Sequence, residues 1–104
     1  MSQEKKMVLE IIGKIEQNME LFYQQKNMEA LDEFQQVLVM MMNMVDAVFA
    51  YRDTHEEFEV DEEKIKDTLT EAMSALESKD YVMLADVIQY DFVEYVQELA
   101  ETME

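Results

Sequence analysis

The chain contains no proline and only one glycine, Gly13, in its 104 residues. Proline and glycine supply the fixed and left-handed backbone conformations on which tight turns and β-bulges depend, and both interrupt helices. A chain with almost none of either can form long helices, but it has few means of making the tight turns that join strands. The sequence therefore predicts an all-α protein.

Length and apolar content predict one folded domain that spans residues 1–104. Hydrophobic residues make up 49% of the chain, which is too many for a disordered protein even at a formal net charge of −17. A chain of this length can bury roughly 60 to 70% of the surface that it exposes when unfolded. Cysteine is absent, so we expect neither disulfides nor a thiolate metal site to stabilise the core.

Apolar residues recur at helical spacing in four segments, at about residues 3–25, 28–52, 62–77 and 81–102. The residues before them, Ser2, Asn27, Asp61 and Asp80, are expected N-caps. The expected inward faces are Met7, Ile11, Ile15, Met19 and Phe22; then Leu31, Phe34, Leu38, Met41, Val45 and Val48; then Ile65, Leu69, Ala72 or Met73, and Leu76; and finally Leu84, Ile88, Phe92, Tyr95 and Leu99.

Short links predict two helical hairpins, at about residues 2–53 and 62–104, with an acidic connector, THEEFEVD, at about residues 54–61. Short links make the two helices of a pair antiparallel, and two such pairs close most simply as an antiparallel four-helix bundle. The hairpins align at an offset of 54 residues, which pairs Ile11 with Ile65, although the links agree better at 53. Whether the hairpins arose by duplication stays open.

Two of the predicted helices carry more apolar residues than one buried face needs. In the segment VLVMMMNMVDAVFAY, residues 37–51, we expect a core stripe of Val37, Leu38, Met41, Met42, Val45, Val48 and Phe49. The surplus residues form a second stripe on this helix and one on the fourth, and they are candidates for partner binding: Met40, Met44, Tyr51, Met83, Val87 and Tyr90. They could be extra core, a homodimer seam, or a docking groove for an amphipathic helix, which methionine suits because its side chain adapts to varied partners.

No pattern for catalysis, a cofactor or a metal ion stands out. The single histidine, His55, is not part of the Glu-x-x-His motifs that di-iron bundles need, and we expect it in the connector. The stretch HEEFEVDEE lacks the residue order and the glycine of an EF-hand loop. We therefore expect a protein that is not an enzyme, with no catalytic, cofactor-binding or metal-binding residues. Weak binding of a divalent cation by the acidic connector stays open.

The charge distribution bears on partners and location. Residues 1–53 carry nine acids and five bases, whereas residues 54–104 carry sixteen acids and three bases. Such a surface repels phosphate backbones and anionic lipids, so we expect neither nucleic acid nor membrane partners, and basic proteins would be attracted. The N-terminus has no apolar run long enough for a signal peptide, and residues 37–51 fall short of the ~20 residues that span a bilayer. We expect a cytoplasmic protein.

The two link regions, LFYQQKNMEALDEF and ALESKDYVMLADVI, share a helix, a short Lys-Asn or Lys-Asp link, and an acidic and apolar helix. This pattern resembles that of the small acidic helical chaperones of flagellar protein export, over both hairpins. The resemblance implies a chaperone that holds a helix of an export substrate in the cytoplasm. The expected function is therefore a protein-binding module, as an export chaperone or adaptor. A self-associating homodimeric bundle and an acidic mimic that sequesters a basic protein remain alternatives.

Overall fold

The computed structural model describes all residues 1–104, of which 83% are helical and none form a strand. The helices are α1 (Gln3–Tyr23), α2 (Asn27–Asp53), α3 (Glu62–Glu77) and a last helix in three parts, α4 (Tyr81–Asp86), the π-helical stretch η1 (Val87–Val93) and α5 (Glu94–Thr102). The prediction of an all-α protein is confirmed, and the helix ends lie within two residues of the predicted ones.

Three of the four predicted N-caps are confirmed. The side chains of Ser2, Asp61 and Asp80 each accept a hydrogen bond from the backbone N–H three residues further on, at 3.0 to 3.1 Å. The prediction for Asn27 is wrong, because α2 already begins at Asn27 and Lys26 occupies the N-cap position without a side-chain hydrogen bond. A lysine has no acceptor with which to cap a helix, so the longest helix begins without that stabilisation.

The links after α1 and α3 have the same backbone conformation. Gln25 and Lys79 have positive φ angles of 62° and 59°, and each lies just past the end of its helix. The N–H of the next residue, Lys26 or Asp80, donates to a helix carbonyl five residues back, at 2.9 Å in both links. This is the Schellman motif, which ends helices by satisfying their last carbonyls. The offset of 54 residues therefore holds through the links, with Lys26 equivalent to Asp80.

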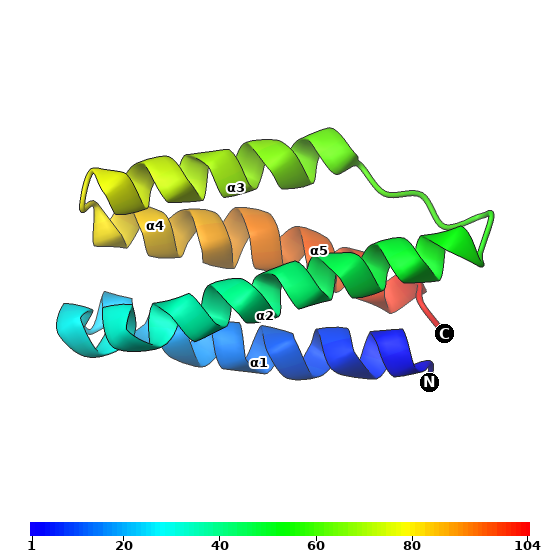
Figure 1. Cartoon of the computed structure of the whole chain (residues 1–104), viewed down its shortest axis with the longest axis horizontal. Coiled ribbons are helices and arrows are strands. Elements are labelled where there is room, and N and C mark those ends of the chain that lie inside the picture. The colour runs from blue at the N-terminus through cyan, green and yellow to red at the C-terminus, as the bar shows by residue number, and fades with distance from the viewer.

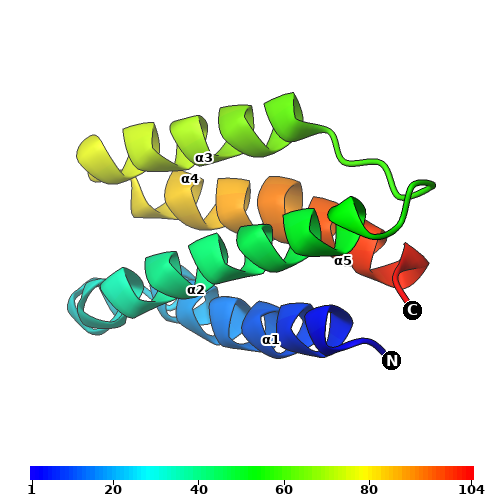
Figure 2. The ribbon, with the colours of Figure 1, turned by 45° about the vertical axis from the view of Figure 1, so that its right-hand side comes forward.

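Helices α2 and α3 each have close backbone contacts on one side only. Helix α2 packs along α1, and α3 packs against α4 and η1. Helix α1 also packs against α4, η1 and α5. Figure 1 shows α3 at one edge of the molecule beside α4, with α1 and α2 on the other side of the last helix, and Figure 2 keeps that order. The backbones of α2 and α3 do not pack closely together, although the connector joins them directly.

A single cluster of 27 buried apolar residues forms the core, and every helix contributes to it. The predicted inward residues of α1 are buried except Met7, and Val8 and Ile12 are buried as well. In α3 the residues that are fully enclosed are mostly small, including Ala72 and Ala75, whereas the larger Leu69 and Met73 are only half-buried. Small buried side chains let α3 approach the last helix closely.

The connector is fixed to the end of α2 and to the C-terminus. Phe58 is buried and its ring is edge-on to the Tyr51 ring, with 4.9 Å between the ring centroids, while the His55 ring stacks on the Tyr51 ring with 3.7 Å between the centroids. The Tyr51 hydroxyl accepts a hydrogen bond from the backbone N–H of Glu104 at 3.0 Å. His55 lies in the connector, as predicted. Tyr51 contacts both the connector and the C-terminal residue at this end of the molecule.

Candidate partner-binding groove

The six predicted partner-binding residues do not form two surface stripes. Met44 has an exposed fraction of 0%, and Tyr51 and Val87 are also buried, so the prediction that these three are available to a partner is wrong. Met40 is half-buried beside α1. Only Met83 and Tyr90, at 61% exposure for the tyrosine, lie on the surface of the last helix. The structure thus separates residues that the helical spacing placed together.

In α2, the predicted buried face differs from the observed one by a rotation about the helix axis. The buried face of α2 consists of Ala30, Phe34, Val37, Met41, Met44, Val48 and Tyr51. The residues predicted on the far edge of the core stripe are instead half-buried or exposed: Leu38, Met42, Val45 and Phe49. Because α2 is apolar on most of its circumference, the sequence alone does not fix which side faces the core. The surplus apolar face exists, but it consists of the residues that were predicted to lie in the core and not of those predicted to bind a partner.

In the last helix, the prediction for Val87 failed because of the π-helical stretch. Hydrogen bonds between residues five apart widen the helix, so the side chains no longer recur every 3.6 residues. As a result, four residues of this stretch are buried: Val87, Ile88, Phe92 and Val93. They form two pairs of sequence neighbours whose side chains would point in more different directions in a regular α-helix. Val87 therefore joins the core, whereas Met83 and Tyr90 remain outside.

The apolar side of α2 that faces away from α1 forms one wall of a groove, and α3 forms the other. The groove has a volume of about 880 Å³, within the range of ligand-sized concavities. Its apolar lining consists of Val45 and Phe49 from α2 and Ile65, Leu69 and Met73 from α3. Its polar lining, Glu62, Glu63, Lys66, Thr70, Ser74 and Glu77, comes entirely from α3. Ile65 is buried in the core, whereas the other four apolar side chains are half-buried and keep part of their surface exposed in the groove.

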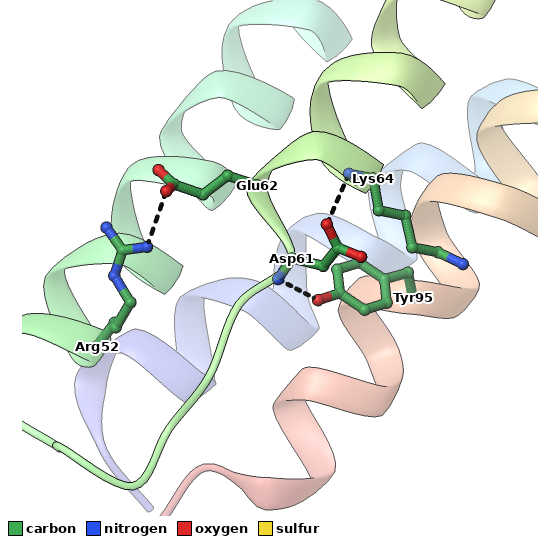
Figure 3. A network of polar contacts seen from close by, with 5 residues as sticks. All are labelled: Arg52, Asp61, Glu62, Lys64 and Tyr95. Carbon is green, nitrogen blue, oxygen red and sulfur yellow. Dashed lines mark hydrogen bonds and ion pairs between the residues drawn. The ribbon is translucent and has the colours of Figure 1, made fainter.

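A polar cluster lies at the start of α3, where Glu62 lines one end of the groove (Figure 3). The Arg52 guanidinium lies 4.7 Å from the centroid of the Phe49 ring, and its Nη1 is 3.5 Å from a carboxylate oxygen of Glu62. On the other side of α3, the Asp61 backbone N–H donates to the Tyr95 hydroxyl at 2.7 Å. These contacts link the start of α3 to both α2 and α5.

Sequence reasoning missed the groove because it treated Leu69 and Val45 as core. One signal could have indicated it. In α3 the small residues Ala72 and Ala75 lie on one side of Leu69 and Met73, and a face of alanines permits the closest helix contact. That contact is with the last helix, which turns the larger residues toward the space beside α2.

A second polar contact lies between α1 and α4, outside the groove. The Tyr23 hydroxyl donates to Asp86 at 2.7 Å. Partial burial, this hydrogen bond and the negative charges nearby all raise the pKa of Tyr23 above its usual value. Tyr23 is therefore a stable donor at neutral pH that joins α1 to α4.

A second concavity, of about 700 Å³, lies at the connector and includes His55 and three connector glutamates. The Nδ1 of His55 is 2.9 Å from the carbonyl oxygen of Tyr51, which can only accept a hydrogen bond, so this contact favours the tautomer with a hydrogen on Nδ1. No group of three or more His, Cys, Asp or Glu side chains is placed to hold a metal ion.

Helix α2 is long and apolar enough, by length and composition alone, to cross a membrane. The core helix of a globular protein meets the same criterion, and 44% of the most apolar window of α2 is buried by the rest of the chain. Met41, Met44 and Val48 of this helix lie in the common core.

The fold and the groove define an all-helical protein with an open interhelical concavity. The chain belongs to the family described as Domain of unknown function (DUF8042), whose model matches residues 1–102. No curated protein and no solved structure matches the chain.

Proposed function

We propose that this chain is a protein-binding module, not an enzyme, and that it holds a helix of a partner protein in the groove between α2 and α3. An export chaperone or an adaptor works in this way, and the resemblance of the two link regions to flagellar export chaperones favours the first. The observation that carries the proposal is the partly exposed apolar lining of the groove, with Phe49, Leu69 and Met73 half-buried.

An amphipathic helix fits a groove of this kind because it places apolar residues at positions i, i+3, i+4 and i+7 along one side. Covering the groove would remove the remaining apolar surface from water, which stabilises a complex by about 25 cal/mol for each Å² buried. Methionine at positions 42 and 73 suits the task, since flexible side chains can adapt to the partner. Met42, at 43% exposure, lies one helical turn from Val45 on the same side of α2.

We propose further that the four helices form an antiparallel four-helix bundle of two hairpins in one domain. The contacts of α1 with α2 and of α3 with α4, together with three-residue links, support this arrangement. It matters for function because such a bundle normally closes on all four sides. Here the fourth side, between α2 and α3, would be left for a partner.

Two alternatives remain in view. A homodimer could cover the same groove with a second copy, and the strongly acidic surface could bind a basic protein by charge alone. A binding mode that depends only on charge weakens steeply as salt screens it, whereas an apolar contact does not. We propose a cytoplasmic location and partners other than nucleic acid and membranes, which cell fractionation and vesicle flotation of the full chain would check.

Site-specific photo-crosslinking in cells tests the proposal directly. A photoreactive phenylalanine analogue at position 49 lies in the groove, and the same analogue at position 39 lies on the outer face of α2, where Val39 is 60% exposed. We expect position 49, and not position 39, to crosslink to a helical segment of one partner protein. Equal crosslinking from both positions would contradict the groove, and crosslinking to the chain itself would identify the homodimer.

A further inference from the structure

We infer that the groove between α2 and α3 selects an amphipathic helix of about four turns whose apolar stripe is bordered by lysine or arginine. This inference rests on the proposed function and adds the chemistry of the partner to it. The length of α3 indicates the length of the partner's helix, and the charges on the rim of the groove independently indicate the charge of that helix.

The length comes from α3. The polar and apolar lining residues run from Glu62 to Glu77, the whole of a helix of 16 residues. At 1.5 Å per residue, this wall is roughly 22 Å long and matches a partner helix of about 15 residues. Ile65, Leu69 and Met73 recur every four residues along it, with Ile65 buried and the other two half-buried, and Val45 and Phe49 lie one turn apart on the opposite wall. The α3 wall thus presents a row of side chains that can interleave with those of a helix, and α2 flanks this row over one turn.

The charge comes from the rim. Glu62, Glu63 and Glu77 border the groove, Lys66 is the one cation among its lining residues, and Arg52 lies at the end that Glu62 marks. Among these, only Glu62 has an ion-pair partner, Arg52, so Glu63 and Glu77 are free to meet a cation. The half of the chain that contains α3 carries sixteen acids and three bases. The local rim and the field of the whole molecule therefore both favour a positively charged helix.

The same charge argues against other occupants. A second copy of the chain brings a further formal charge of −17, so closure of a homodimer over an acidic rim is opposed by repulsion. An acidic amphipathic helix meets the same repulsion at Glu63 and Glu77. A neutral helix could use the apolar lining, but it would lack the attraction that speeds association.

Synthetic peptides of 15 residues can test this inference with the full chain. Three peptides share one leucine face and carry lysine, glutamine or glutamate on the other, and fluorescence anisotropy measures their affinity at low and physiological salt. We expect the lysine peptide to bind at least about tenfold more tightly than the glutamate peptide, with the glutamine peptide between them. Some binding of the lysine peptide should persist at physiological salt, because part of it is apolar.

Two matched variants distinguish peptide binding in the groove from binding by charge alone. Leu69→Glu places a charge in the groove, and Val39→Glu adds the same charge on the outer face of α2. If the groove binds the peptide, Leu69→Glu should weaken the lysine peptide by about tenfold or more, whereas Val39→Glu should leave it within about twofold. If charge alone binds it, both variants should strengthen binding. Met73→Ser, which adds no charge, tests the same wall should Leu69→Glu fail to fold by circular dichroism.

The outcomes distinguish the inference from the function on which it rests. Equal affinity for all three peptides, still lost in Leu69→Glu, would overturn the basic partner and leave a groove that binds helices. Absence of binding by any peptide would overturn both. Sedimentation that shows a dimer of the chain, converted to a monomer by Met73→Ser, would assign the groove to a second copy instead.

Discussion

The start of α2 offers the sharpest test of the local physics, because the chain contains its own control. Lys26 and Asp80 occupy equivalent positions in two identical links, and the carbonyl of each accepts the first helical hydrogen bond, at 2.9 Å. Asp80 also caps its helix through its side chain, whereas Lys26 does not, so the N–H of Glu29 lacks the partner that the N–H of Met83 has. The change Lys26→Ser should supply it.

The magnitude follows from this difference. The backbone angles of Lys26 (φ −86°, ψ 56°) and Asp80 (φ −91°, ψ 83°) are similar, so a serine at position 26 needs little rearrangement to reach the N–H of Glu29. A serine cap is worth about 1 kcal/mol relative to alanine. In a domain of this size, that corresponds to a shift of roughly 4 to 8 °C in the melting temperature. Lys26 is exposed, so few other contacts are lost.

Urea denaturation followed by circular dichroism measures the effect, with Lys26→Ala as the matched control. Both variants remove one positive charge, so the difference between their free energies of unfolding isolates the cap. We expect Lys26→Ser to exceed Lys26→Ala by about 1 kcal/mol, and Asp80→Ala to lose about the same amount. If Lys26→Ser and Lys26→Ala unfold at the same urea concentration, the equivalence of the two links is mistaken.

Three further predictions concern burial, the links and pH. Met44→Ala should lower the free energy of unfolding by about 2 to 5 kcal/mol because it leaves a cavity, and Met83→Ala should change it by less than about 0.5 kcal/mol, in the same urea titration. Equal effects would mean that Met44 is not in the core. Gln25→Gly should raise the melting temperature, since glycine adopts a positive φ without the strain of a side chain; a lower one would show that Gln25 is unstrained. The pKa of Tyr23 is raised by folding, so its contribution to stability is complete below about pH 10 and is lost as the pH rises above that; Tyr23→Phe should flatten this loss in unfolding curves measured at alkaline pH, and an unchanged slope would contradict it.

Local features were readable from the sequence because they depend on neighbours in the chain. The absence of proline and the single glycine led to the all-α prediction, and Ser2, Asp61 and Asp80 marked helix starts, since a cap needs only an acceptor beside the first turn. The N-cap prediction at Asn27 failed for an equally local reason. The Schellman motif of the link ends at Lys26, and residue type alone did not show where the motif would stop.

The side of α2 that faces the core was decided only by tertiary structure. Met44 and Val45 are adjacent, both apolar and both good core residues, yet Met44 is fully enclosed and Val45 lines the groove. Helical spacing ranks faces by polarity, and α2 has too few polar residues to rank them. Similarly, the π-helical stretch moved Val87 into the core by changing the spacing itself.

The sequence by itself therefore determined that this chain is helical, where its helices begin and end to within two residues, and that two helices have apolar residues to spare. Which of those residues remain uncovered depended on the packing of α3. The small residues Ala72 and Ala75 bring α3 against the last helix, away from α2, and so leave Phe49 and Leu69 on facing walls. This contact lies between helices joined by a three-residue link, but its geometry is set by the volumes of several side chains packed together, which no single periodic pattern records.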